Sequence, residues 1–221
     1  MDARERGLTM VRQEKLIAIL RGVSIEDTMD VTDALVRGGV KLLEFTLDHT
    51  RSSCVEETCK KVSMVRARYG EELLLGCGTV LFPAEAEAAV AAGACMIISP
   101  DASPEVIRRT RELGGISMPG AYTPTEIVTA WNAGADFVKL FPASAMGLEY
   151  VKAVRGPLGH IPMLAVGGVA PETVADFLGA GVTGFGVGGP LLPKTALAQK
   201  DWPEITRRAL AFTRAICANR G

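Results

Sequence analysis

Residues 133–142 read AGADFVKLFP, and this stretch gives the strongest indication of the fold. Gly134 is placed to end a helix, because the residue after a helix favours a left-handed conformation that costs glycine little. The run Phe137–Phe141 follows almost at once and is mostly apolar on both faces, as expected of a parallel strand covered by helices. The stretch therefore predicts a helix end followed directly by a buried parallel strand.

The same arrangement recurs along the chain. Gly-Gly or Ala-Gly pairs at 38–39, 92–93, 114–115 and 180–181 precede further short apolar runs. Helical stretches that open with proline or acidic residues lie between these runs. The predicted strands are Leu16–Leu20, Lys41–Thr46, Leu73–Gly76, Cys95–Ser99, Ile116–Met118, Phe137–Phe141, Met163–Val166 and Gly184–Val187.

The alternation of eight predicted strands with helices predicts an α/β fold. We expect a single-domain (β/α)8 TIM barrel that spans residues 1–221. An extra N-terminal helix at about residues 2–14 is expected to cover the bottom of the barrel. An open doubly wound sheet is the alternative. It usually carries a glycine-rich nucleotide turn after its first strand, which Arg21-Gly22-Val23-Ser24 is not.

Charge and cysteine usage restrict the function. With 24 basic and 25 acidic residues, the chain has no net field to hold nucleic acid or an anionic membrane, so a small-molecule partner is expected. The charged residues 1–6 lead into no long apolar stretch, which predicts a cytoplasmic protein without a signal peptide or membrane span. Five scattered cysteines and two histidines show no metal-ligand spacing, so reduced structural thiols and no metal site are expected.

Lys139 is the candidate nucleophile, because a lysine inside an apolar strand serves no evident structural purpose. Burial disfavours the ammonium, lowers the pKa and leaves a neutral amine that can attack a ketone to form a Schiff base. A lysine whose head group reaches water at the strand end, or one held in a structural ion pair, are the alternatives.

Glu44 is a second charged residue in an apolar run, LLEFT at 42–46, and strand alternation places it on the same face as Thr46. Facing Lys139 across the barrel, its carboxylate could move protons during carbon–carbon cleavage, directly or through water. It could equally keep Lys139 ionised and inert. Barrel active sites stand at the C-terminal ends of strands, where these residues are predicted to lie.

The last two predicted strands end in the glycine pairs Gly167-Gly168 and Gly188-Gly189. Such pairs let backbone N–H groups approach an anion, as the phosphate sites of barrels after strands seven and eight require. Tight turns without a ligand are the alternative. Arg21 follows the first strand and could clamp a carboxylate by a two-pronged contact, or form an ordinary surface ion pair.

Seven motifs together resemble the 2-keto-3-deoxy-6-phosphogluconate / 4-hydroxy-2-oxoglutarate aldolase family over nearly the whole chain. They are IAILRG (Ile17–Gly22), GGVKLLEFTL (Gly38–Leu47), GCGTVL (Gly76–Leu81), ISPD (Ile98–Asp101), MPGAYTPTE (Met118–Glu126), VKLFPAS (Val138–Ser144) and AVGGV (Ala165–Val169). The resemblance implies a class I aldolase that reversibly cleaves a 2-keto-3-deoxy (phospho)sugar acid or 4-hydroxy-2-oxoglutarate to pyruvate and an aldehyde. It also implies a lysine Schiff base, no metal or other cofactor, and a homotrimer.

The resemblance further implies residue roles. Lys139 would be the Schiff-base lysine and Glu44 the general acid/base, with Arg21 and Thr79 near the substrate carboxylate. The other residues expected at the substrate are Thr46, Pro100, Pro119 and Phe141 around the pocket, and Gly167, Gly168, Gly188 and Gly189 around a distal phosphate.

Two positions depart from the family pattern. Asp48 stands where some members carry an arginine, so the carboxylate would depend on Arg21 or Arg51. Gly188-Gly189-Pro190 stands where many members carry a serine in the last phosphate loop. An unphosphorylated keto acid, or another phosphorylated sugar acid such as the galactonate epimer, is therefore an alternative substrate.

Other functions also fit these features. A phosphate-binding epimerase, isomerase or thiamin-phosphate-synthase-like transferase would use the same glycine loops without a Schiff base at Lys139. A non-catalytic barrel could hold a sugar acid without turning it over, and an aldolase imine could also decarboxylate oxaloacetate. His49 and His160 are interpreted as loop residues, with a secondary substrate contact left open for His49.

Overall fold

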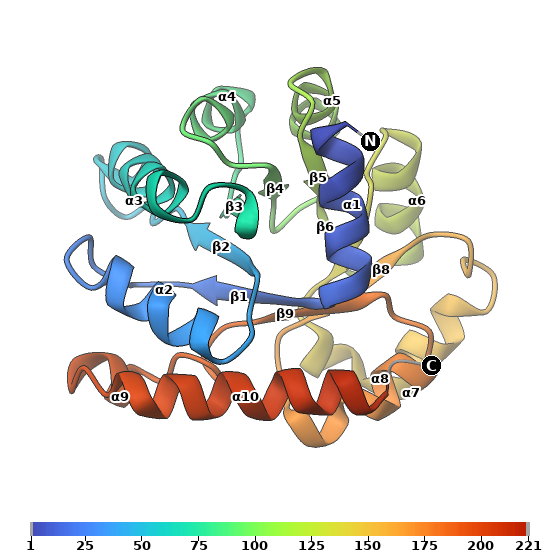
Figure 1. The fold of residues 1–221 in the computed structure, drawn as a ribbon. Helices are drawn as coiled ribbons and strands as arrows, with labels where there is room; N and C mark the ends of the chain where they lie inside the picture. The colour runs from blue at the N-terminus through green and yellow to red at the C-terminus, as the bar shows by residue number, and fades with distance from the viewer. Residues whose placement is uncertain (1, 220–221) are drawn as a thin grey trace.

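The computed structural model describes residues 2–219 as a ring of strands surrounded by helices (Figure 1). The strands are β1 (Leu16–Leu20), β2 (Leu42–Thr46), β3 (Leu74–Gly78), β4 (Met96–Ile98), β5 (Ile116–Met118), β6 (Gly120–Ala121), β7 (Val138–Leu140), β8 (Met163–Val166) and β9 (Gly184–Val187). The α-helices are α1 (Ala3–Glu14), α2 (Thr28–Arg37), α3 (Cys54–Tyr69), α4 (Pro83–Ala91), α5 (Pro104–Glu112), α6 (Pro124–Asn132), α7 (Ala143–Arg155), α8 (Val174–Gly179), α9 (Lys194–Ala198) and α10 (Trp202–Ala218), with 3-10 helices η1 (Gly70–Glu72) and η2 (Pro171–Thr173).

The strands form one parallel sheet in the order β5-β4-β3-β2-β1-β9-β8-β7-β6. Its two ends, β5 and β6, are successive pieces of one chain segment that are separated by Pro119. The backbone amide of Lys139 donates to the Pro119 carbonyl at 2.8 Å, and the amide of Asp136 donates to that of Ser117 at 3.0 Å. The sheet is therefore a nearly closed barrel. The predicted barrel is confirmed, and the open-sheet alternative is wrong.

Two strands differ from their predicted ranges, and the others agree to within one residue at each end. The strand predicted at Ile116–Met118 is interrupted at Pro119 and continues as β6. The interruption arises because proline has no backbone N–H to donate to the ladder. Gly120 fits there because a β-carbon at this position would lie 2.3 Å from the Pro100 carbonyl oxygen. The third strand is β3 rather than Leu73–Gly76, because the glycines at its C-terminal end still pair with β2.

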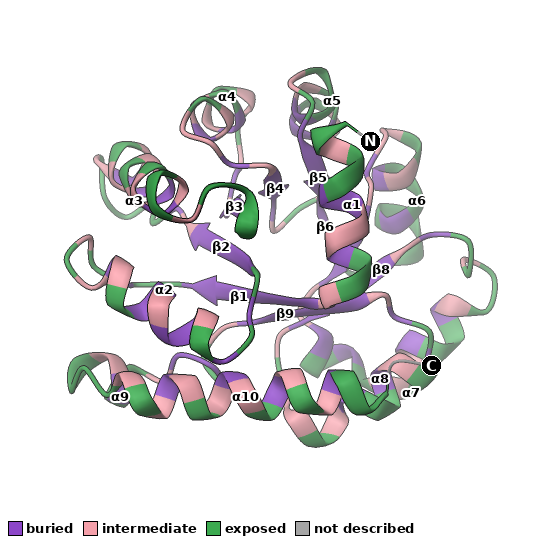
Figure 2. Cartoon of the chain, viewed as in Figure 1, coloured by how far each residue is buried: buried purple, intermediate pink, exposed green. Residues whose placement is uncertain are grey.

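Apolar side chains form a core on each side of the strands. The strands are buried along nearly their whole length, whereas the helices expose one face (Figure 2). Outside the ring, strand residues such as Val138 pack against the helices. Inside the ring, Leu42 and Phe137 belong to a second cluster. Because side chains alternate across a strand, Glu44 follows Leu42 into the barrel, and Lys139 follows Phe137.

Helix α1 covers the end of the barrel at which the strands begin (Figure 1). Its Leu8 and Val11 are buried in the inner cluster, and Arg4 forms an ion pair with Asp136 just before β7. The predicted N-terminal helix over the barrel bottom is confirmed. Within residues 2–219, no helix has the length and apolar character needed to cross a membrane.

Candidate active site

Strands β2 and β7 each place a charged side chain inside the barrel. Lys139 is 5% exposed and Glu44 is 3% exposed. In the sheet register Glu44 lies opposite Ile19 of β1, and Lys139 lies opposite Gly120 of β6. Both side chains thus occupy an interior that apolar residues otherwise fill, above the level of Phe137.

Glycines of β3 make room for the Glu44 carboxylate. In the register Gly76 lies opposite Glu44, and Gly78 lies opposite Thr46. A β-carbon at Gly78 would lie 1.9 Å from Glu44 Oε1, so any other residue there would displace the carboxylate. Sequence reasoning missed the role of Gly78, because the predicted strand ended at Gly76 and left Gly78 outside it.

Burial shifts the pKa of each group in the direction that favours its neutral form. Burial lowers the pKa of Lys139, while the Glu44 carboxylate opposes this shift and the Arg21 guanidinium adds to it. Burial raises the pKa of Glu44, against the effects of Lys139 and Arg21. Each group can therefore exchange a proton more readily near neutral pH than its free amino acid would.

Lys139 lines a cavity of about 220 Å³ at the C-terminal ends of β1, β7, β8 and β9. Lys139 Nζ lies 4.9 Å from the centroid of the Phe141 ring, and Arg21 reaches the same cavity from β1. The other predicted residues in its wall are Gly167, Gly168, Gly188 and Gly189. Sequence reasoning missed Ile19, Val166, Val169, Gly186, Val187 and Pro190, whose apolar character does not distinguish a cavity wall from a core.

The two glycine pairs differ in what they require. Gly167 and Gly168 have φ values of 93° and 75°, and a β-carbon at Gly168 would lie 2.3 Å from Ser144 Cβ. The turn itself therefore needs glycine at this pair. A β-carbon at Gly189 would have no atom within 4 Å, so that position is unobstructed at the cavity wall.

The remaining predicted residues lie at the same end of the barrel but do not line the Lys139 cavity. They are Glu44 within β2, Thr46 at its end, Thr79 after β3, Pro100 after β4, and Pro119 between β5 and β6. Thr46 instead lines a neighbouring cavity of about 310 Å³, together with Asp48 and Arg51. Arg51 forms an ion pair with Glu57 at 2.5 Å, so the arginine next to Lys139 is Arg21.

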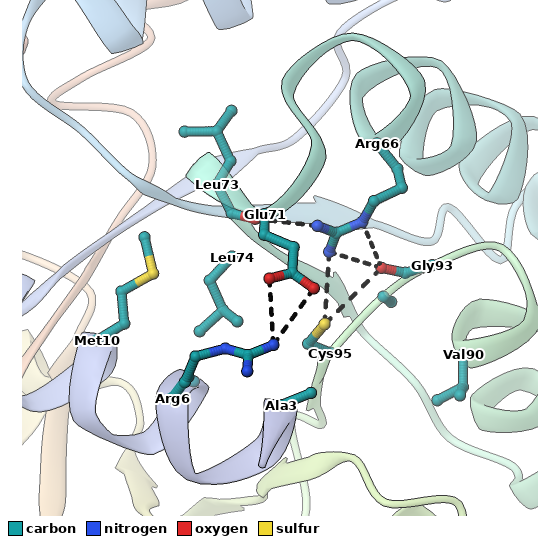
Figure 3. Close-up of a pocket in the computed structure, with 12 residues that line it drawn as sticks. Ala3, Arg6, Met10, Arg66, Glu71, Leu73, Leu74, Val90, Gly93 and Cys95 are labelled. Carbon is teal, nitrogen blue, oxygen red and sulfur yellow. Dashed lines mark hydrogen bonds and ion pairs between the residues drawn. The ribbon is translucent and has the colours of Figure 1, made fainter. Parts of the chain in front are cut away.

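A larger cavity of about 480 Å³ lies at the opposite end of the barrel, between α1 and the start of β3 and β4 (Figure 3). Apolar side chains such as Leu74 form much of its wall. Arg6 bonds to Glu71 at 3.1 Å, and Arg66 donates to the Gly93 carbonyl at 2.9 Å, as Figure 3 shows. These pairings tie α1 and α3 to the barrel bottom, where barrel enzymes do not place their chemistry.

A metal site is not apparent in the part of the chain that the structure describes. Across residues 2–219, no group of three or more His, Cys, Asp or Glu side chains is arranged to hold a metal ion. All five cysteines are free thiols, and Cys54 and Cys77 are buried. Burial raises the pKa of Cys77, which favours its thiol form.

A barrel that holds a buried lysine and carboxylate below an open cavity can be compared with known families. A family profile described as KDPG and KHG aldolase matches residues 8–208. The chain belongs to the KDPG and KHG aldolase family. The family resemblance of its motifs is thereby confirmed, and membership supports a lyase activity of the aldolase type on a small-molecule substrate.

Individual members of the KDPG and KHG aldolase family are similar over most of the chain. The 2-dehydro-3-deoxy-6-phosphogalactonate aldolase of Escherichia coli (strain K12) is 35% identical, covering 90% of this chain and 93% of the relative. The 2-dehydro-3-deoxy-phosphogluconate aldolase of Pseudomonas aeruginosa (strain PAO1) is 32% identical, covering 90% and 88%. A structure of KDPG aldolase from Legionella pneumophila, with pyruvate captured at low pH as a covalent carbinolamine intermediate, is 25% identical with a TM-score of 0.83, covering 93% and 97%.

The electrostatics of the site predict opposite effects of two substitutions on the pKa of Lys139. Glu44→Gln should lower this pKa further, because the carboxylate opposes the effect of burial. Arg21→Met should raise it, because the guanidinium adds to the lowering. The measurement is the rate of Lys139 acetylation as a function of pH, followed by peptide mass spectrometry, since only the neutral amine reacts.

Lys152, exposed on α7, is the internal control and should keep the same pH profile in both variants. Shifts of the Lys139 profile in the same direction for both variants would contradict the electrostatic arrangement.

Proposed function

We propose that this protein is a class I aldolase in which Lys139 forms a Schiff base with the ketone carbon of a 2-keto-3-deoxy sugar acid. The observation that carries the proposal is the burial of both Lys139 and Glu44 in the barrel, with Lys139 in the wall of the cavity at the C-terminal ends of the strands. Family membership supports the reaction class. The covalent carbinolamine with pyruvate in the Legionella relative supports the imine route.

The lysine performs the first half of the reaction. Burial favours the neutral amine, so Lys139 Nζ adds to the C2 ketone of the substrate and forms a carbinolamine. The carbinolamine hydroxyl then leaves as water and an iminium remains. The positive nitrogen of the iminium attracts the electron pair of the C3–C4 bond, which prepares that bond for cleavage.

Glu44 moves the protons of the reaction. Its raised pKa allows the protonated form to donate to the departing carbinolamine hydroxyl. The resulting carboxylate removes the C4 hydroxyl proton through a water molecule. The C3–C4 bond breaks, the aldehyde departs, and the electron pair forms an enamine. Protonation at C3 and hydrolysis then release pyruvate and restore the Lys139 amine.

The same cavity suits an anionic substrate. The Arg21 guanidinium and the backbone of Gly167-Gly168 and Gly188-Gly189 share its wall. We assign the keto-acid carboxylate to Arg21, in the wall of this cavity, and to Thr79, which lies outside the wall at the same end of the barrel. We assign a distal phosphate to the glycine turns. The substrate class is therefore a 2-keto-3-deoxy-6-phospho sugar acid. The name of the Escherichia coli relative supports the galactonate epimer, and 4-hydroxy-2-oxoglutarate is the unphosphorylated alternative.

Turnover separates this proposal from the other barrel functions. A non-catalytic sugar-acid-binding barrel would release no pyruvate, and a phosphate-binding epimerase, isomerase or transferase would not need an imine at Lys139. The homotrimer, the single-domain organisation and the cytoplasmic location stay predictions.

The proposal is tested by measuring pyruvate release from 2-keto-3-deoxy-6-phosphogalactonate and from its gluconate epimer. Lactate dehydrogenase is the coupling enzyme that detects the pyruvate. Lys139→Ala should abolish release of pyruvate while its circular dichroism stays that of the unchanged protein. Glu44→Gln should slow release by about 10²- to 10⁴-fold, the usual contribution of a general acid/base. Substantial turnover by Lys139→Ala would refute the assignment of the nucleophile.

Substitutions in the two glycine turns should separate phosphorylated from unphosphorylated substrates. Gly168→Ala should raise KM for the phosphorylated acid by about tenfold, because it disturbs the turn that offers backbone N–H groups. Gly189→Ser should lower that KM, because its hydroxyl enters open space at the cavity wall. KM for 4-hydroxy-2-oxoglutarate should change much less in both variants. Equal changes in KM for the two substrates would contradict the assignment of the phosphate to these turns.

A further inference from the structure

Thr79, directly after β3, has a backbone conformation that a threonine adopts only at a cost. Its φ is +62°, whereas β-branched residues strongly avoid positive φ values. The other non-glycine residues with positive φ in residues 2–219 are Lys15 and Lys200, which are not β-branched. Such a conformation persists only when surrounding contacts hold it, and such strain is concentrated at functional sites.

The contact that holds Thr79 itself comes from His49, in the loop after β2. His49 Nε2 lies 2.8 Å from the Thr79 carbonyl oxygen. Because a carbonyl only accepts hydrogen bonds, Nε2 is the protonated nitrogen that donates here. On its other side, His49 Nδ1 lies 3.6 Å from Glu85 Oε1. The imidazole therefore lies between the Thr79 turn and the start of α4.

The residues after Thr79 are fixed from the same side. Glu85 accepts from the backbone amides of Leu81 at 2.8 Å and Phe82 at 3.2 Å. The amide of Val80 donates to the Ile98 carbonyl of β4 at 3.2 Å. The residues that follow Thr79 are thus held by Glu85 and by β4, while the His49 side chain bonds to Thr79 itself.

The loop that carries His49 continues directly from the strand that carries Glu44. Its amide at Leu47 donates to the Gly78 carbonyl at 2.9 Å, so this loop and the end of β3 are joined twice. Asp48 bonds instead to Thr50, through Oδ1 to the Thr50 hydroxyl at 2.6 Å. Of the adjacent pair Asp48 and His49, it is the histidine that reaches across to the Thr79 turn.

We infer that His49 is a positioning residue that holds Thr79 in the left-handed conformation needed to bind the carboxylate of the keto acid. The inference rests on the proposed function, in which Thr79 contacts that carboxylate. His49 lies in a loop, as interpreted from the sequence, and the inference gives it a role there. This role differs from a direct substrate contact, because the imidazole acts through the Thr79 backbone. Loss of His49 should therefore impair substrate binding more than the chemical steps.

The test compares His49→Ala, His49→Gln and His160→Ala. His49→Ala should raise KM for the keto acid about tenfold with a much smaller change in kcat, since one positioning hydrogen bond is lost. His49→Gln should restore KM to within about threefold, because its side-chain amide can supply the donor that Nε2 supplies. His160, the chain's other histidine, packs against Trp131, and His160→Ala should leave KM unchanged.

A second comparison uses Thr79→Gly, because glycine adopts a positive φ without assistance. In the Thr79→Gly background, adding His49→Ala should change KM by less than about twofold, and it should lower the urea midpoint less than it does in the Thr79 background. An unchanged KM in His49→Ala, no recovery in His49→Gln, or equal effects of His49→Ala in both backgrounds would each overturn the inference.

Pyruvate trapping in the unchanged protein keeps the two proposals distinguishable. Without an adduct on Lys139 the proposed function fails, and the urea comparison still decides whether His49 holds the Thr79 turn. With an adduct and no coupling between His49 and Thr79, the proposed function stands and the inference about His49 fails.

Discussion

The removal of Lys139 and Glu44 from water is the constraint on which the rest of the structure depends. Burying a single charge costs several kilocalories per mole, and an apolar barrel interior does little to offset it. The barrel reduces this cost by placing opposite charges in one interior and by giving the Glu44 carboxylate a glycine-lined recess beside β3. The same desolvation lowers the pKa of Lys139 and raises that of Glu44. An unfavourable environment for charge is thus a favourable one for an amine nucleophile and a proton carrier.

The contacts that stabilise the barrel and the residues of the proposed reaction lie at opposite ends of it. At the bottom, α1 (Figure 1) contributes Leu8 and Val11 to the inner core, and ion pairs tie it to Asp136 before β7 and to Glu71 of η1. At the top, the chain carries costly features, which are the buried charges of Lys139 and Glu44 and the left-handed Thr79. Features of this kind persist only where the surrounding packing holds them in place. The apolar clusters inside and outside the ring of strands supply that packing.

Sequence patterns predict the fold well because it depends on local signals. Glycine helix ends and short apolar runs locate the strands, and strand alternation places Glu44 and Lys139 inside. The unpredicted break at Pro119 and the longer β3 depend on how neighbouring strands pair. For the site, strand ends bring Arg21, Lys139, Phe141 and the glycine pairs to one cavity. The other predicted residues, Glu44, Thr46, Thr79, Pro100 and Pro119, lie outside its wall. The contacts of Gly78 with Glu44 and of His49 with Thr79 were not predicted, because they join segments that are far apart in sequence.

The most direct test of the central claim is the mass of the folded protein after incubation with pyruvate and borohydride, followed by peptide mapping. The buried Lys139 amine predicts a single pyruvyl adduct per chain, located on Lys139 and lost in Lys139→Ala. Exposed lysines such as Lys152 should stay unmodified, because they lie outside the Lys139 cavity. No adduct in a folded sample, or an adduct on another lysine, would contradict the account.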